Sequence, residues 1–300
     1  MKVKDGIIGL LIGDALGVPV EFKSREYLHK NPITKMEGHG TYNMPSGTWS
    51  DDTSMTLATM ASIVTKNTID YTDIIEEFCE FVFNGKYVQY YVFDYGNTTV
   101  SALEKYCSGT PALESGGTSD RSNGNGSLMR ILPLAYIPDI TYETIENISG
   151  LTHAHKRSKI ACVLYIEIAR SMLKNDLTII KHVKNAFESI KKYYKNENEL
   201  KYFKKIFNLD FSGGVSSGGY VLDSLESTIY CLLTTDNYQD AVLKAVNLGG
   251  DTDTTAAICG GLAGIYYGYD AIPIDWINTV DQIDKVLSLC EKYEEYCDES

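Results

Sequence analysis

No two cysteines in this sequence have the C-x-x-C spacing. The seven cysteines are scattered over 300 residues, and their number is odd. This pattern indicates neither a zinc site nor a disulfide framework. Several of them fall within apolar helical stretches, where a reduced cysteine behaves as a small hydrophobic side chain. We therefore expect a reducing, cytoplasmic setting.

Long apolar runs are also missing. No segment approaches the roughly 20 apolar residues that a membrane-spanning helix needs. Residues 1–22 superficially resemble a signal peptide, because two lysines precede an apolar stretch. Asp14 and Glu21 interrupt that stretch, and no clean small-x-small cleavage site follows. We therefore expect no membrane partner.

Positive charge is scarce. The chain has 27 Lys and Arg against 40 Asp and Glu, which gives a formal net charge of −13. Because binding to a phosphate backbone depends on Lys and Arg, a nucleic-acid partner is not expected. The apolar fraction of 44% is typical of a soluble globular chain.

Strand-like alternation of apolar and polar residues is rare, and glycines and prolines mark the ends of helical patterns. We predict an all-α fold, a compact helical bundle with one domain over residues 1–300, and expect a monomer. No linker-like segment divides the chain, and residues 23–47 are loop-like. The predicted helices include residues 3–17, 71–84, 97–107, 151–174, 176–194, 198–207, 239–247 and 275–295.

Residues 247–267 have a polar beginning and a small, apolar continuation. The pattern predicts a turn at Gly249 and Gly250, followed by a helix start that carries Asp251 and Asp253. Two carboxylates at a buried helix start cost desolvation and mutual repulsion unless cations compensate. The alternative is helix capping by Asp251 with a solvated Asp253.

A second acidic helix start lies about 200 residues earlier. Ser50, Asp51 and Asp52 precede an apolar helical pattern that continues to Ile63. One such start is helix capping in most proteins. Two of them could face a shared pair of hard cations, for which oxygen ligands are suitable. This interpretation requires Asp51 and Asp251 to meet at one cavity.

Three other features allow both a functional and a structural interpretation. Gly124 and Gly126, in a glycine turn expected to lead into a short helix, would let N–H groups converge on an anion, although such turns are common. His153 and His155 would not share a helix face, so a zinc pair is not indicated; one could contact a substrate, cap a helix or lie in the core. Tyr220 could stack on a planar ring or pack at a helix start.

Taken together, these residues resemble the ADP-ribosylglycohydrolase family of the DraG/ARH type. The resemblance covers nearly the whole chain, and the joint order and spacing of the motifs make it specific. The motifs are GDALG at 13–17, EF at 21–22, WSDDT at 49–53, FDYGNT at 93–98, NGNGSLMR at 123–130, THAH at 152–155, GYV at 219–221 and GGDTDT at 249–254.

The resemblance implies an all-helical fold with two divalent cations, Mg²⁺ or Mn²⁺, in a central cleft. The family usually has threonine where this chain has Ser50, and the hydroxyl is retained. Glu21 and Asp52 are the implied catalytic residues, with Glu21 at the reacting centre. The implied metal ligands are Ser50, Asp51, Asp52, Asp251, Asp253 and Thr254.

The resemblance also implies where a substrate would lie. The glycine turn would hold a diphosphate, one of the two histidines would contact the substrate, and Tyr220 would stand near the adenosine. Asp94 and Asn97 match the acceptor side of arginine-type members, which fits a carboxylate facing a guanidinium. The implied substrate-binding residues are Asp94, Asn97, Gly124, Asn125, Gly126, Ser127, His153, His155 and Tyr220.

The activity implied is hydrolysis of the glycosidic bond between ADP-ribose and an acceptor. Mono-ADP-ribosyl-arginine on a protein is the preferred substrate, and ADP-ribosyl-serine, O-acyl-ADP-ribose or another conjugate is an alternative. A metal phosphohydrolase acting on a nucleotide would suit the same carboxylates. A non-catalytic ADP-ribose-binding relative should have lost some acids, whereas this chain retains Glu21, Asp51, Asp52, Asp251 and Asp253.

Overall fold

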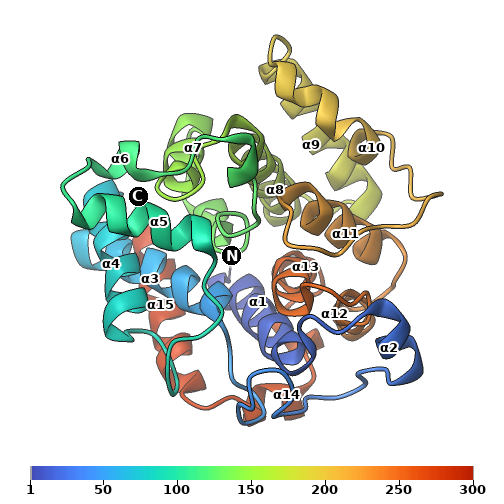
Figure 1. The fold of residues 1–300 in the computed structure, drawn as a ribbon. Helices are drawn as coiled ribbons and strands as arrows, with labels where there is room; N and C mark the ends of the chain where they lie inside the picture. The colour runs from blue at the N-terminus through green and yellow to red at the C-terminus, as the bar shows by residue number, and fades with distance from the viewer. Residues whose placement is uncertain (1, 300) are drawn as a thin grey trace.

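The structure, a computed structural model, describes residues 2–299 and is built from helices alone within that range. The predicted all-α fold is therefore confirmed (Figure 1). The α-helices are α1 (Val3–Gly17), α2 (Arg25–Lys30), α3 (Asp51–Lys66), α4 (Tyr71–Asn84), α5 (Asn97–Cys107), α6 (Ala112–Ser115), α7 (Tyr142–Gly150), α8 (Lys156–Lys174), α9 (Ile179–Tyr193), α10 (Lys204–Phe207), α11 (Val221–Leu233), α12 (Tyr238–Val246), α13 (Thr252–Tyr267), α14 (Ile274–Thr279) and α15 (Ile283–Glu299). Short 3₁₀ helices are η1 (Val18–Val20), η2 (Asp120–Ser122), η3 (Leu132–Tyr136), η4 (Asn198–Phe203) and η5 (Tyr269–Ala271).

Helices α1 and α13 pack side by side at the centre of the molecule (Figure 1). Both are buried on nearly every side, as expected for helices whose apolar residues do not form a single stripe. Their backbones approach closely at glycines: a Cβ on Gly260 would overlap the carbonyl of Gly9, and a Cβ on Gly264 would overlap that of Asp5. The close contact sets the two helices in a fixed register.

That register brings the end of α1 against the beginning of α13. A Cβ on Gly17 would collide with the backbone of Asp253, so only glycine fits there. The turn before α13 is formed as predicted, with Gly249 and Gly250 both in the left-handed region (φ 76° and 77°). The N-terminus of α3 packs beside the same junction, because Ser50 and Thr53 hydrogen-bond to α1.

Three local predictions were wrong. The 23–47 segment contains α2, whose N-terminus is capped by Ser24 accepting from the Tyr27 N–H. The helix expected from residue 151 begins only at Lys156, because His155 occupies its N-cap and accepts from the Arg157 N–H. The short helix expected after Gly126 is a hydrogen-bonded turn that leads into η3.

The buried apolar side chains form one continuous cluster that draws on helices from both ends of the chain. In the part of the chain that the structure describes, none of the helices is both long enough and apolar enough to cross a bilayer.

Candidate metal centre and substrate pocket

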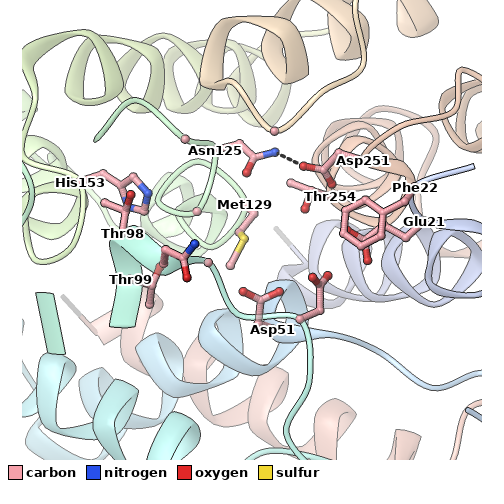
Figure 2. A pocket seen from close by; sticks show the side chains of 16 residues that line it. Glu21, Phe22, Asp51, Thr98, Thr99, Asn125, Met129, His153, Asp251 and Thr254 are labelled. Carbon is pink, nitrogen blue, oxygen red and sulfur yellow. Dashed lines mark hydrogen bonds between the residues drawn. The ribbon is translucent and has the colours of Figure 1, made fainter. Parts of the chain in front are cut away.

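The acidic starts of α3 and α13 face one cavity of about 260 Å³. Asp51 and Thr254 line it from the first turns of the two helices, and Asp251 lines it from the N-cap of α13. Glu21 joins them from the residue that follows η1 (Figure 2). The convergence that the sequence interpretation requires is therefore present: residues about 200 positions apart share one cavity.

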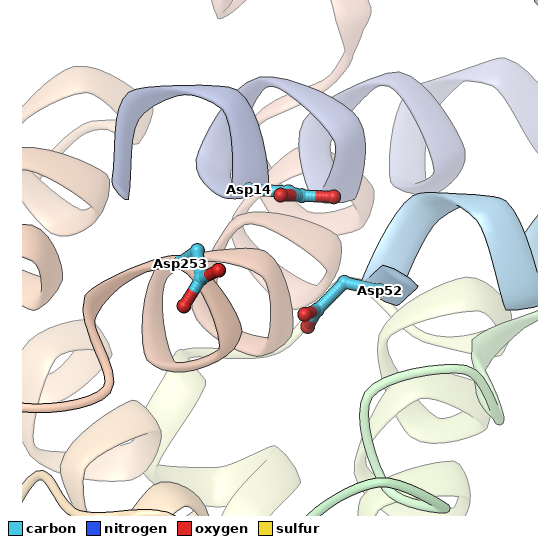
Figure 3. Close-up of side chains that lie close together, drawn as sticks. All are labelled: Asp14, Asp52 and Asp253. Atoms are coloured by element: carbon cyan, nitrogen blue, oxygen red, sulfur yellow. The ribbon is translucent and has the colours of Figure 1, made fainter. Parts of the chain in front are cut away.

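Asp52 and Asp253, in the first turns of the same two helices, do not line this cavity and are fully buried. Asp14, from α1, completes a group of three carboxylates whose oxygens lie within 4.8 Å of one another (Figure 3). A second group, Glu21, Asp94 and Asp253, satisfies the same distance. Asp253 belongs to both groups, so the buried acids and the half-buried Asp94 form one continuous cluster rather than two separate ones.

Asp14 has a separate task in this cluster. Its carboxylate accepts from the backbone N–H of Ser50 (2.9 Å) and from both the N–H (3.0 Å) and the hydroxyl (2.6 Å) of Thr53. These N–H groups lie at the start of α3, where backbone N–H groups have no hydrogen-bond partner within the helix. An acid from α1 therefore caps α3 and holds Asp51 and Asp52, which lie between the two capped positions.

Several carboxylate oxygens in the cluster are left without a partner. Asp52 Oδ1, Asp251 Oδ1 and Asp253 Oδ2 are buried and accept no hydrogen bond from any described residue. Buried carboxylates without partners are strongly unfavourable unless a cation compensates their charge. Aspartate and hydroxyl oxygens are the ligands that Mg²⁺ and Mn²⁺ prefer. The residues present therefore fit hard divalent cations.

The other oxygens of these residues are held in place. Asp52 Oδ2 accepts from the Ser50 and Thr254 hydroxyls at 3.1 Å each, which joins the two helix starts directly. Asp251 Oδ2 accepts from the Asn125 amide at 2.8 Å (Figure 2). In each case one oxygen is fixed by the protein, and the other is available to a cation. The alternative interpretation, in which the Asp251 side chain caps α13, is wrong, because that side chain makes no cap hydrogen bond.

Burial raises the pKa values of Asp14, Glu21, Asp52 and Asp253, and repulsion between neighbouring carboxylates adds to the shifts of the last three. Burial is the main cause of the raised pKa of Glu21, to about 9, and the charge of Asp94 adds to it. Burial also raises the pKa of Asp14 to about 6, against the hydrogen bonds from Thr53 and Ser50. The pKa values of Asp52 and Asp253 are well above the ordinary value, first through burial and then through neighbouring carboxylates. Without cations, protons would have to neutralise these acids.

The metal-free protein should therefore lose stability as the pH rises from 7 to 9. A carboxyl whose pKa is raised on folding contributes its full stabilisation at pH values below its pKa in the unfolded chain. That contribution is lost as the pH rises through its pKa in the folded protein, which is about 9 for Glu21. The pKa of His153 is lowered to about 3, so this residue makes stability rise with pH. It does so only below pH 6.5, the ordinary pKa of histidine, and therefore outside this range. Thermal unfolding in chelator, followed across this pH range, measures the effect.

The same series with Mn²⁺ or Mg²⁺ is the control. Bound cations should replace the protons, so the unfolding temperature should depend much less on pH. A chelated protein whose stability increases from pH 7 to pH 9 would contradict the assignment.

The opposite wall of the cavity is formed by the glycine turn and a histidine. Gly124, Gly126 and His153 line it together with Asn125. His153 is buried, and burial with the nearby charge of Arg130 keeps it neutral. The Asn125 amide also donates to Ser224 (2.9 Å), so this residue links the glycine turn to Asp251 as well as lining the cavity.

Three of the expected substrate residues are not among those lining the cavity. Ser127 is fully buried and accepts from the Ser149 hydroxyl at 2.9 Å. His155 caps α8, so the capping alternative describes it. Tyr220 is half-buried before α11, where its hydroxyl accepts from Arg157 at 3.2 Å. The lining residues from the expected set are Glu21, Asp51, Asp94, Asn97, Gly124, Asn125, Gly126, His153, Asp251 and Thr254.

No role was predicted from the sequence for two residues that hold the acids of the site, Asp14 and Tyr42, nor for six further lining residues, which are Phe22, Gly96, Thr98, Thr99, Met129 and Gly219. The signal for Asp14 was a carboxylate inside an otherwise apolar helix, a position that calls for a buried partner. Tyr42 had no signal, because it lies in the segment interpreted as loop, yet its hydroxyl donates to Glu21 at 2.6 Å.

A model of the ADP-ribosylglycohydrolase family matches residues 1–300. This chain belongs to that family. The similar proteins include an ADP-ribosylarginine hydrolase, Tri1, of Serratia proteamaculans, which is 31% identical over 97% of this chain and 78% of its own length. They also include the ADP-ribosyl-[dinitrogen reductase] glycohydrolase of Rhodospirillum rubrum, which is 30% identical over 94% of each chain.

More distant matches extend the same family. An ADP-ribosylhydrolase, ARH3, of Gallus gallus is 24% identical over 97% of this chain and 92% of its own length. A solved structure described as an ADP-ribosylglycohydrolase-related protein complex has a TM-score of 0.83 and 23% identity, covering 99% of this chain and 98% of that chain. The likeness to that structure shows the common fold. Family membership supports a hydrolase as the class of protein.

Proposed function

We propose that this protein hydrolyses the glycosidic bond between ADP-ribose and a modified arginine side chain of a protein, with the help of two divalent cations. The observation that carries the proposal is the unpartnered, buried oxygens of Asp52, Asp251 and Asp253 beside a cavity lined by Glu21. Family membership supports the same class of reaction.

In this proposal, the metal ligands are Ser50, Asp51, Asp52, Asp251, Asp253 and Thr254. When bound, the cations would supply positive charge that orients the ribose and makes a water molecule more acidic. The chain's own contribution is to hold the oxygens in place: Asp14 caps α3, and Asn125 fixes Asp251. Residues that hydrogen-bond to metal ligands set the orientation of those ligands and the affinity for the metal.

The bond that breaks joins the ribose anomeric carbon to the acceptor nitrogen. Water adds its oxygen to the carbon, and the nitrogen leaves with a proton. Positive charge develops on the ribose as the bond lengthens, and the surrounding carboxylates stabilise it. Glu21 transfers the proton, by taking it from the water or delivering it to the departing acceptor. Asp52, the other implied catalytic residue, contributes as a metal ligand whose Oδ2 is fixed by the Ser50 and Thr254 hydroxyls.

The acceptor assignment rests on charge. Asp94 and Glu21 lie together at the cavity, and their repulsion contributes to the raised pKa of Glu21. A guanidinium relieves that repulsion and can hydrogen-bond to a carboxylate in a bidentate manner. A neutral serine or acyl acceptor does neither. The Serratia relative is named for ADP-ribosylarginine, which supports the same choice.

The glycine turn and His153 line the remaining wall, where we propose that the diphosphate binds. His153 is neutral and can donate one hydrogen bond to a phosphate oxygen without adding a buried charge. We place the adenosine toward Gly219 and Tyr220, because Gly219 lines the cavity and its carbonyl accepts from the Asn125 N–H of the glycine turn at 3.0 Å.

A panel of mono-ADP-ribosylated substrates tests the proposal. The protein should release free ADP-ribose from an arginine-modified protein, at least about tenfold faster than from a serine-modified peptide or an O-acyl conjugate, as expected for losing a charge-assisted hydrogen bond. Chelator should abolish the release, and Mg²⁺ or Mn²⁺ should restore it. Formation of AMP in place of ADP-ribose would instead indicate phosphoanhydride cleavage.

A further inference from the structure

Residues 39–44 form a tight turn in an unusual backbone conformation. His39 (φ 67°), Gly40 (φ 62°) and Asn43 (φ 55°) are all in the left-handed region. Non-glycine residues adopt that region infrequently, so the contacts around the turn hold His39 and Asn43 there. The His39 N–H donates to the Met44 carbonyl and closes the turn.

The turn is pinned to the segment that carries Glu21. The Thr41 N–H donates to the Pro19 carbonyl (2.9 Å), and the Thr41 hydroxyl donates to the Glu21 carbonyl (2.7 Å). A Cβ on Gly40 would overlap the Pro19 carbonyl, so the turn lies directly against η1. These contacts place Tyr42, at the tip of the turn, beside the Glu21 carboxylate.

The Tyr42 hydroxyl donates to Glu21 Oε2 at 2.6 Å, a short hydrogen bond. Glu21 is buried, so water competes little for this oxygen. Burial and the adjacent carboxylate raise the pKa of Tyr42, so the phenol keeps its proton and remains the donor. A glutamate side chain has three rotatable bonds, and this contact restricts them.

The opposite side of Tyr42 contacts the loop that carries Asp94. The rings of Tyr42 and Phe93 are 4.7 Å apart between centroids, and the Tyr91 hydroxyl donates to the Tyr42 carbonyl at 3.3 Å. Asp94, the next residue after Phe93, is itself in the left-handed region (φ 52°) and lines the cavity. Tyr42 therefore joins Glu21 to the loop on the acceptor side of the cavity, in addition to the direct approach of Asp94 to Glu21.

We propose that Tyr42 is a positioning residue: it holds the Glu21 carboxylate in its reactive orientation and couples it to the loop that carries Asp94. This inference rests on the proposed function and extends it to a residue that the motifs do not include. Small displacements of a reacting group reduce turnover without preventing substrate binding.

The test is a double-mutant cycle with Tyr42→Phe and Glu21→Gln. Tyr42→Phe should lower kcat for ADP-ribose release by about 10- to 100-fold, the size of losing a hydrogen bond to a charged group, with KM changed by less than about threefold. In the Glu21→Gln background, the same substitution should change kcat by less than about threefold, because the carboxylate it positions is gone.

Tyr90→Phe is the matched control. Tyr90 lies on the same loop as Phe93, and its hydroxyl likewise donates to a carboxylate, that of Asp281, at 2.7 Å, outside the cavity. This variant should keep the wild-type kcat. Phe93→Leu, which removes the ring beneath Tyr42 and leaves its hydroxyl, should lower kcat in the wild-type background and have little effect in the Glu21→Gln background.

The outcomes separate the two proposals. A wild-type protein that releases no ADP-ribose from any conjugate would contradict the proposed function. An active wild type with Tyr42→Phe equal to Tyr90→Phe in kcat, or with additive effects in the cycle, would overturn the role of Tyr42 alone. Unfolding temperatures of the variants, within a few degrees of the wild type, exclude loss of the fold as the cause.

Discussion

Replacing Glu21 by glutamine should reduce the release of ADP-ribose by about 10²- to 10⁴-fold, the usual contribution of a positioned general acid or base. Glutamine has nearly the same shape and can still accept the hydrogen bond from Tyr42. It cannot accept or deliver the proton that the reaction requires. The loss should appear in kcat, measured as the rate of ADP-ribose release at saturating substrate and cation.

Divalent-cation binding should be largely retained in Glu21→Gln, because the unpartnered oxygens belong to Asp52, Asp251 and Asp253. Calorimetric titration with Mn²⁺ measures it. Glu26→Gln is the matched control, since Glu26 is exposed on α2 and forms an ion pair with Lys30. Unchanged turnover in Glu21→Gln would remove Glu21 from its proposed role, whereas loss of cation binding would make it a metal ligand.

Replacing Asp52 by asparagine should abolish cation binding and turnover together. Asp52 has one oxygen fixed by Ser50 and Thr254 and one left without a partner. Substitution of a residue that only hydrogen-bonds to a metal ligand weakens metal binding by roughly 10- to 100-fold. Loss of a direct ligand should weaken it more. Calorimetry with Mn²⁺ and the rate of ADP-ribose release measure the two effects.

The stability of Asp52→Asn should change in the opposite direction. In chelator, the variant should unfold at a temperature equal to or above that of the wild type, because burial and the charges of Asp14 and Asp251 oppose ionisation of Asp52. In Mg²⁺, the wild type should gain stability and the variant should not. Asp275→Asn, an exposed acid in the first turn of α14, is the control. A variant destabilised in chelator and still stabilised by Mg²⁺ would contradict the assignment of Asp52 as a ligand.

The helices were predictable because their signals are local. Apolar periodicity and glycine or proline at the ends predicted 71–84 and 97–107, and α4 and α5 have these bounds. The prediction failed where a side chain decided the boundary. His155 caps α8 and delays its start to Lys156, and Ser24 caps α2 within a segment whose glycines and prolines suggested only loop.

The acids of the site were predictable for a similar reason. Adjacent carboxylates at the start of an apolar helix are unfavourable without compensation, so Asp51 and Asp52, like Asp251 and Asp253, were conspicuous in the sequence. The resemblance to the ADP-ribosylglycohydrolase family then implied that the two acidic helix starts share one metal site. Neither signal could show that Ser127 faces the interior, because a glycine turn leaves the direction of the following side chain open.

The sequence by itself determined the all-α class and the bounds of helices such as α1, α4 and α5, and it singled out Asp51, Asp52, Asp251 and Asp253 as acids that call for a cation or a proton. Only the tertiary structure decided how those carboxylates are held. Asp14 caps a helix that begins 37 residues later, and Tyr42 reaches Glu21 from a strained turn that no periodicity marks. The physical reason is that burial and helix periodicity act over a few residues. The partner of a buried polar group is chosen by packing, here by the glycine contacts that set α1 against α13.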